Sequence, residues 1–252
     1  MLRETPALRT GRSPHHKVLI AGFEKHRRNR AHSQANDSYL SSRHRYYDVS
    51  VPTLRTLAKT WLKENSGIPD PEFLAVLDGL YRGKSYEEKV LASILLSDHR
   101  TGPETIGPKL LDGWLDHLFG WAEIDSLCVC SSSAARRNFT EDEILADWSE
   151  WARFIRKLSR DKNINKRRAA LVFLTAPLRY SEDKRLAALG FEVIEKLKPE
   201  RHIMITKAVS WLLRSMVRHH ERAVAAYVRE NRHSLPAIAV RETTRKITTG
   251  RK

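Results

Sequence analysis

The stretch VPTLRTLAKTWL, residues 51–62, decides the fold class of this 252-residue chain. Its apolar side chains recur at intervals of three and four residues, which is the period of a helix with one buried face. Pro52 suits the first turn of a helix, because a residue there needs no backbone hydrogen-bond donor. The stretch therefore predicts an amphipathic helix.

The same apolar spacing recurs along most of the chain. It predicts further helices in residues 16–28, 34–47, 73–80, 85–95, 110–118, 140–158, 169–178, 186–197, 203–217, 223–228 and 238–247. Ser85 with Glu88, and Thr140 with Glu143, have the spacing of a capping box, which marks the start of a helix. No run shows the two-residue alternation that is typical of a half-buried strand. We therefore predict an all-α protein.

The number and spacing of these helices indicate how they are arranged. About twelve short helices, at roughly 35 to 45 residues per pair, match HEAT-like or armadillo-like arrays. Such pairs stack into a curved solenoid with a concave surface. A globular helical bundle is the alternative, and the absence of one long central helix favours the solenoid. We expect residues 31–252 to form a single repeat domain with a concave basic face, and residues 1–30 to form a basic, partly disordered extension.

The charge of the chain indicates its partner. The net charge is +15, with an excess of +6 in residues 1–48 and +8 in residues 199–252. Basic excess of this kind is typical of proteins that bind nucleic acid. No apolar run approaches the roughly 18 residues that a membrane helix needs. Cys128 and Cys130 are too close in sequence for an ordinary disulfide. We expect a cytoplasmic, nucleoid-associated bacterial protein without a membrane partner.

Several enzyme classes have no support in the sequence. The chain has no glycine-rich phosphate loop, no Gly-x-Ser-x-Gly elbow and no histidine pair with zinc spacing. We therefore predict neither a metal ion, nor a nucleotide, nor another cofactor.

The segment Gly120-Trp121-Ala122-Glu123-Ile124-Asp125-Ser126 is the strongest candidate for chemistry. On a helix, Trp121 and Asp125 lie one turn apart on the same face. The pair could present an aromatic surface and one negative charge to the same ligand. Such a charge would be unexpected in a DNA-binding protein unless it meets a cation.

Two basic segments could bind phosphate. On one predicted helix, Lys207, Trp211, Arg214 and Arg218 form a stripe that is separate from the apolar one. This stripe suits either a tryptophan covered by arginine stems or an aromatic platform on a phosphate-binding face. The second segment, residues 153–168, carries eight basic side chains against one acidic side chain and ends in Lys166, Arg167 and Arg168. Positive charge at a helix start is unfavourable unless an anion binds there.

Four segments together resemble one family. They are Tyr39-Leu40 followed by VSVPTLR at 49–55, the W-x-x-x-D segment at 121–125, RRAA at 167–170, and KAVSWLLR at 207–214 followed by Arg241-Glu242. Their order and spacing resemble the AlkD-like DNA alkylation repair glycosylases, which are built from HEAT-like repeats. The resemblance covers residues 36–248. The chain departs from the family at Gly120 and near Asn165, where relatives often carry aromatic residues.

The resemblance implies a monofunctional DNA glycosylase of base excision repair. Such an enzyme hydrolyses the N-glycosidic bond of cationic N3- or N7-alkylated purines in duplex DNA. We expect the protein to be a monomer. Asp125 would be the catalytic carboxylate, and Trp121, Trp211 and Tyr39 would contact the lesion. The residues that would contact the DNA backbone are Lys166, Arg167, Arg168, Lys207, Arg214, Arg218 and Arg241.

Two other functions fit the same sequence. The chain could be a HEAT-like protein that binds damaged or branched DNA without chemistry, although the presence of both Trp121 and Asp125 argues against this. It could also be a protein-interaction scaffold, which the charge excess at both ends disfavours.

Overall fold

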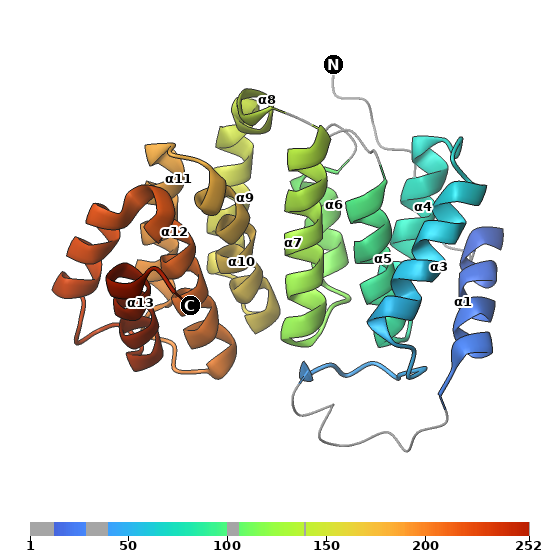
Figure 1. The fold of residues 1–252 in the computed structure, drawn as a ribbon, viewed down its shortest axis with the longest axis horizontal. Coiled ribbons are helices and arrows are strands. Elements are labelled where there is room, and N and C mark those ends of the chain that lie inside the picture. Colours follow the sequence, from blue (N-terminus) through green and yellow to red (C-terminus); the bar gives the residue numbers. More distant parts are fainter. Residues whose placement is uncertain (1–12, 29–39, 100–105, 139, 252) are drawn as a thin grey trace. The chain divides into compact units, whose positions relative to one another are not determined.

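The computed structural model describes residues 13–28, 40–99, 106–138 and 140–251. Twelve α-helices account for the regular structure in these ranges, apart from helical Leu40 and an isolated bridge between Arg45 and Ser85 (Figure 1). The helices are α1 (Pro14–His26), α3 (Val51–Glu64), α4 (Asp70–Tyr81), α5 (Tyr86–Asp98), α6 (Pro108–Leu115), α7 (Gly120–Asn138), α8 (Glu141–Ala146), α9 (Trp148–Ser159), α10 (Ile164–Tyr180), α11 (Lys184–Leu197), α12 (Ile203–Glu230) and α13 (Ala237–Thr249). No helix in the described ranges is both long and apolar enough to span a membrane.

The helix starts follow the sequence signals. Ser85 and Glu88 form the predicted capping box at the start of α5, and Thr140 and Glu143 form the one before α8. Pro52 lies in the first turn of α3, whose Ser50 cap accepts a hydrogen bond from the N–H of Thr53. These caps satisfy backbone donors that a helix start otherwise leaves without partners.

The helix predicted at residues 34–47 is wrong over most of the residues that the structure describes. Residues 34–39 lie outside the described ranges, but residues 41–50 are irregular instead of helical. Ser41 and Asp48 have φ values of 56° and 59°, in the left-handed region, which a right-handed helix excludes. The buried Glu87 carboxylate accepts hydrogen bonds from the backbone N–H groups of Tyr47 and Val49, which a helix would have paired with carbonyl groups.

Two other boundaries differ from the prediction. The segment predicted at 140–158 is broken at Asp147 into α8 and α9. The two segments predicted at 203–217 and 223–228 form the single helix α12, which has a kink at His220.

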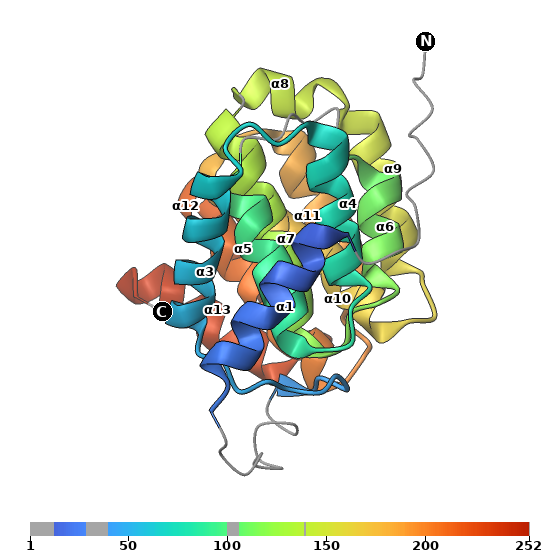
Figure 2. The ribbon, with the colours of Figure 1, turned by 90° about the vertical axis from the view of Figure 1, so that its right-hand side faces the viewer.

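The chain divides between residues 138 and 139 into two compact units. In the first unit, α5 packs against α3, α4 and α7, and α1 lies across α3 and α4 (Figure 2). The helix α1 falls within the predicted N-terminal extension, of which residues 1–12, 29 and 30 lie outside the described ranges. Buried His16 fastens α1 to the unit, because its Nε2 lies 2.8 Å from Oε1 of buried Glu88.

The second unit is built around α10 and α12. The helix α10 packs against α9, α11 and α12, and α13 packs against α12. The predicted apolar stripe of α12, which contains Val209, Leu212, Leu213, Met216 and Val217, is buried in this unit. The opposite stripe of α12, with Lys207, Trp211, Arg214 and Arg218, is therefore left partly exposed.

Candidate active site

Gly120 sets the start of α7. Its φ is +78°, and a Cβ there would lie 2.3 Å from the carbonyl oxygen of Leu40 and 2.5 Å from that of Ser41. No other residue fits this conformation and this close approach. The absence of an aromatic residue at position 120 thus has a local cause in the path of the chain at residues 40–41.

Glu123 joins the start of α7 to that same part of the chain. Its fully buried carboxylate accepts a hydrogen bond from the Ser42 hydroxyl and one of 2.9 Å from the Phe119 N–H. The His44 Nδ1 atom lies 3.0 Å and 3.1 Å from its two oxygen atoms. Glu123 therefore anchors residues 42–44 and also satisfies a backbone donor just before the helix.

Trp121 and Asp125 lie one turn apart on α7, as the sequence predicts. Both side chains are half-buried, whereas Ala122, Glu123 and Ile124 between them are buried. The Trp121–Asp125 face is therefore the accessible side of this turn. The described structure bears out the shared face, while the catalytic role stays a prediction.

Tyr39, the other residue of this predicted site in the first unit, lies outside the described ranges. Its neighbours in sequence, Leu40 and Ser41, are the residues whose backbone lies against Gly120.

In the second unit, the predicted stripe of α12 lies opposite its buried side. Lys207 and Arg218 are exposed, and Trp211 and Arg214 are half-buried. The adjacent Ser210 hydroxyl donates a 2.6 Å hydrogen bond to Glu242 of α13, and Arg214 Nη2 lies 3.3 Å from the same carboxylate. These contacts fix Arg214 at the junction of α12 and α13.

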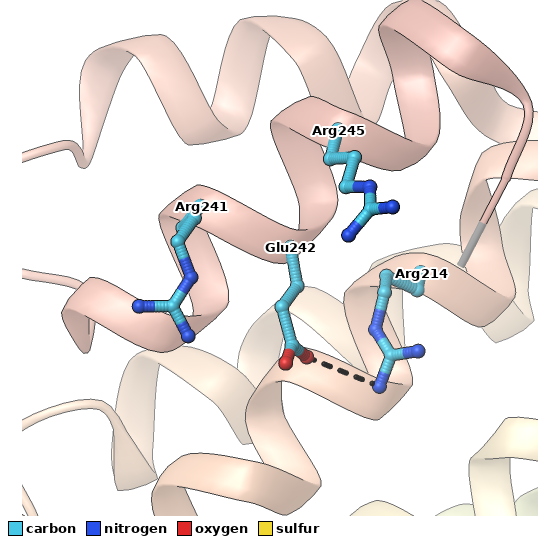
Figure 3. A pocket seen from close by; sticks show the side chains of 4 residues that line it. All are labelled: Arg214, Arg241, Glu242 and Arg245. Carbon is cyan, nitrogen blue, oxygen red and sulfur yellow. Dashed lines mark ion pairs between the residues drawn. The ribbon is translucent and has the colours of Figure 1, made fainter.

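A basic pocket of about 230 Å³ lies at this junction (Figure 3). Arg214, Arg241, Glu242 and Arg245 line it. Three guanidinium groups against one carboxylate leave a net positive charge, which suits a phosphate group. The sequence prediction included Arg214 and Arg241 but missed Arg245, although Arg245 lies four residues after Arg241 on the same helix face.

At the basic start of α10, the protein itself buries or pairs the positive side chains. Lys166 and Arg168 are buried, and Arg168 donates a hydrogen bond to the carbonyl of Met204. Arg167 pairs with Glu200 at 2.7 Å and donates to the carbonyl groups of Asp161 and Lys162. The protein itself thus supplies an anion for Arg167 near this helix start. The DNA contacts of these three residues stay predictions.

The comparison with protein families decides what kind of protein this is. The model of the family described as DNA alkylation repair enzyme matches residues 20–247. The chain belongs to this family. Membership in the DNA alkylation repair family gives the protein a role in DNA repair, and makes DNA its expected substrate.

A solved structure supports the fold assignment. The chain is similar to a predicted DNA alkylation repair enzyme from Enterococcus faecalis, with a TM-score of 0.64 and 15% sequence identity. The match covers 96% of this chain and 100% of the other. No curated protein matches the chain. At this identity the similarity shows the fold alone, and it confirms the predicted all-α helical repeat.

Two features of the site were missed from the sequence. Glu123 stands between Trp121 and Asp125, and its spacing gave no sign that it would turn inward toward Ser42 and His44. Arg245 could have been found from its four-residue spacing to Arg241. In the described ranges, no group of three or more histidine, cysteine, aspartate or glutamate side chains could hold a metal ion.

Proposed function

We propose that the protein is a monofunctional DNA glycosylase that removes cationic N3- or N7-alkylated purines from duplex DNA. The observation that carries this proposal is the Trp121–Asp125 face of α7. Glu123, two residues before Asp125, is fully buried on hydrogen-bond donors of the protein, whereas Asp125 remains on the accessible side. Glu123 thus helps to build the site, and Asp125 lies with Trp121 on the side of the helix turn that a substrate could reach.

The chemistry of the reaction matches these residues. An alkylated purine already carries a positive charge, so it leaves the sugar without protonation by an acid. The sugar is left with oxocarbenium character, as in glycoside hydrolysis. The Asp125 carboxylate would stabilise this cation and orient the attacking water, and the indole of Trp121 would add a surface that favours cations. The residues of the chain perform these steps without a cofactor.

The second unit would contribute DNA binding. Lys207, Arg214 and Arg218 on α12, and Arg241 and Arg245 on α13, offer positive groups for backbone phosphates. We propose that Trp211, which lies within the α12 stripe, contacts the lesion. We also propose that Lys166, Arg167 and Arg168 assist binding, and that the protein acts as a monomer.

The test is release of free base from methylated duplex DNA. Purified protein should release 7-methylguanine or 3-methyladenine, detected by chromatography, without cutting the strand. Binding of methylated DNA with a steep salt dependence but without base release would contradict the glycosylase proposal. That outcome would favour the alternative of a DNA-binding protein without chemistry.

A further inference from the structure

Residues 41–45 form a segment that is fastened to the start of α7 at two alternate positions. Ser42 and His44 both contact the buried Glu123 carboxylate. The backbone N–H of His44 also donates a 3.2 Å hydrogen bond to Ser42 Oγ. Side chains therefore hold the segment against the start of α7, and the bridge between Arg45 and Ser85 adds a backbone pairing at its end.

Arg43 stands between these two anchors and is exposed. Its guanidinium lies 5.4 Å from the centre of the Phe119 ring, and the His44 ring lies 5.3 Å from the same ring. Phe119 is two residues before Trp121. The arginine is therefore held at the same end of α7 as the Trp121–Asp125 face, on an aromatic support that leaves its charge accessible.

We infer that Arg43 binds a phosphodiester group of the DNA backbone beside the lesion, and that Glu123 is the positioning residue that holds Arg43 there. The inference rests on the proposed function, because it takes the Trp121–Asp125 face as the lesion site. A guanidinium suits a phosphate oxygen pair, since its planar donors match that geometry. Glu123 is buried and would not touch DNA itself. It would affect DNA binding through Ser42 and His44, which hold Arg43 in place.

The test measures affinity for an undamaged duplex by fluorescence anisotropy over a series of salt concentrations. Arg43→Gln should make the slope of log affinity against log salt less steep by about one, as expected for one lost phosphate contact. Arg43→Lys keeps the charge and should keep the slope. An unchanged slope in Arg43→Gln would overturn the assignment of Arg43.

Glu123→Gln tests the positioning role. By charge alone, loss of a carboxylate should strengthen DNA binding, whereas loss of positioning should weaken it. We expect weaker binding, and we expect Arg43→Gln to cause little further loss in the Glu123→Gln background. If the two substitutions lower DNA affinity additively in the double variant, or if Glu123→Gln binds DNA more tightly than the wild type, the role of Glu123 is overturned.

Two controls keep these results interpretable. If Glu123→Gln does not fold, Ser42→Ala replaces it, because that variant removes one of the two anchors. Ser42→Ala should lower the affinity for DNA by less than Glu123→Gln would. An unchanged affinity in Ser42→Ala would overturn the positioning role. The binding measurements use undamaged DNA, so they are independent of catalysis. Wild-type protein that binds DNA but releases no base would refute the proposed function, while the Arg43 and Glu123 variants would still decide this inference.

Discussion

Replacement of Gly120 by alanine should destabilise the first unit. The left-handed conformation at +78° costs an alanine about 1–2 kcal/mol. The new Cβ would also lie 2.3 Å from the Leu40 oxygen, so backbone must move, and such overpacking costs about 1–3 kcal/mol. We expect a loss of about 2–5 kcal/mol in the free energy of unfolding, together with slower base release, because Trp121 follows directly.

Urea denaturation followed by circular dichroism measures this loss. The matched control is Gly113→Ala in α6, where a Cβ meets nothing within 4 Å. Alanine is favoured over glycine inside a helix by about 0.5–1 kcal/mol, so this variant should be as stable as the wild type or slightly more stable. If Gly120→Ala unfolds at the same urea concentration as the wild type, the claim that Gly120 packs too closely on residues 40–41 to accept a side chain is refuted.

Three further predictions address the two units. Arg241→Gln and Arg245→Gln should each make the slope of log DNA affinity against log salt less steep by about one. The control is Arg156→Gln, which should change this slope less because the Arg156 guanidinium is paired with Glu192. The same slope in all three variants would contradict the pocket as a phosphate site. Trp211→Ala should slow base release more than it weakens binding of undamaged DNA, and equal losses in both assays would argue against contact with the lesion. Burial raises the pKa of Glu88, but hydrogen bonds from His16 and Ser85 outweigh it and lower this pKa to about 2. A lowered carboxyl pKa stabilises the fold above the unfolded pKa, so the stability advantage of wild type over Glu88→Gln should shrink by about 3 kcal/mol as the pH falls from 5 to 2. An advantage that does not change with pH would refute the pairing.

Local signals in the sequence predicted most of the helices. Capping boxes, the proline in the first turn of α3 and the apolar spacing of α12 each depend on residues within one or two turns, so they can be recognised without the fold. The error at residues 41–50 has a different origin. The non-helical path there depends on Glu87 and Glu123, which are distant in sequence and turn inward only in the folded unit.

The candidate site shows the same division. The shared face of Trp121 and Asp125 follows from helix periodicity and could be predicted. The role of Gly120 could not, because it depends on a contact with residues 40–41. Similarly, the sequence alone predicts an external anion beside Arg167, but Glu200, 33 residues later, forms an ion pair with it. Charge runs show where cations are, and only the fold shows which of them the protein itself neutralises.

The rate of base release by Asp125→Asn tests the central claim most directly. At a separation of about 4 Å and an effective dielectric constant of about 20, a carboxylate stabilises a cation by about 4 kcal/mol. Its loss should therefore slow single-turnover release of 7-methylguanine about a thousandfold. Glu64→Gln, which removes an exposed carboxylate at the end of α3, is the matched control and should release base at the wild-type rate. Equal rates for Asp125→Asn and wild type would contradict the catalytic assignment.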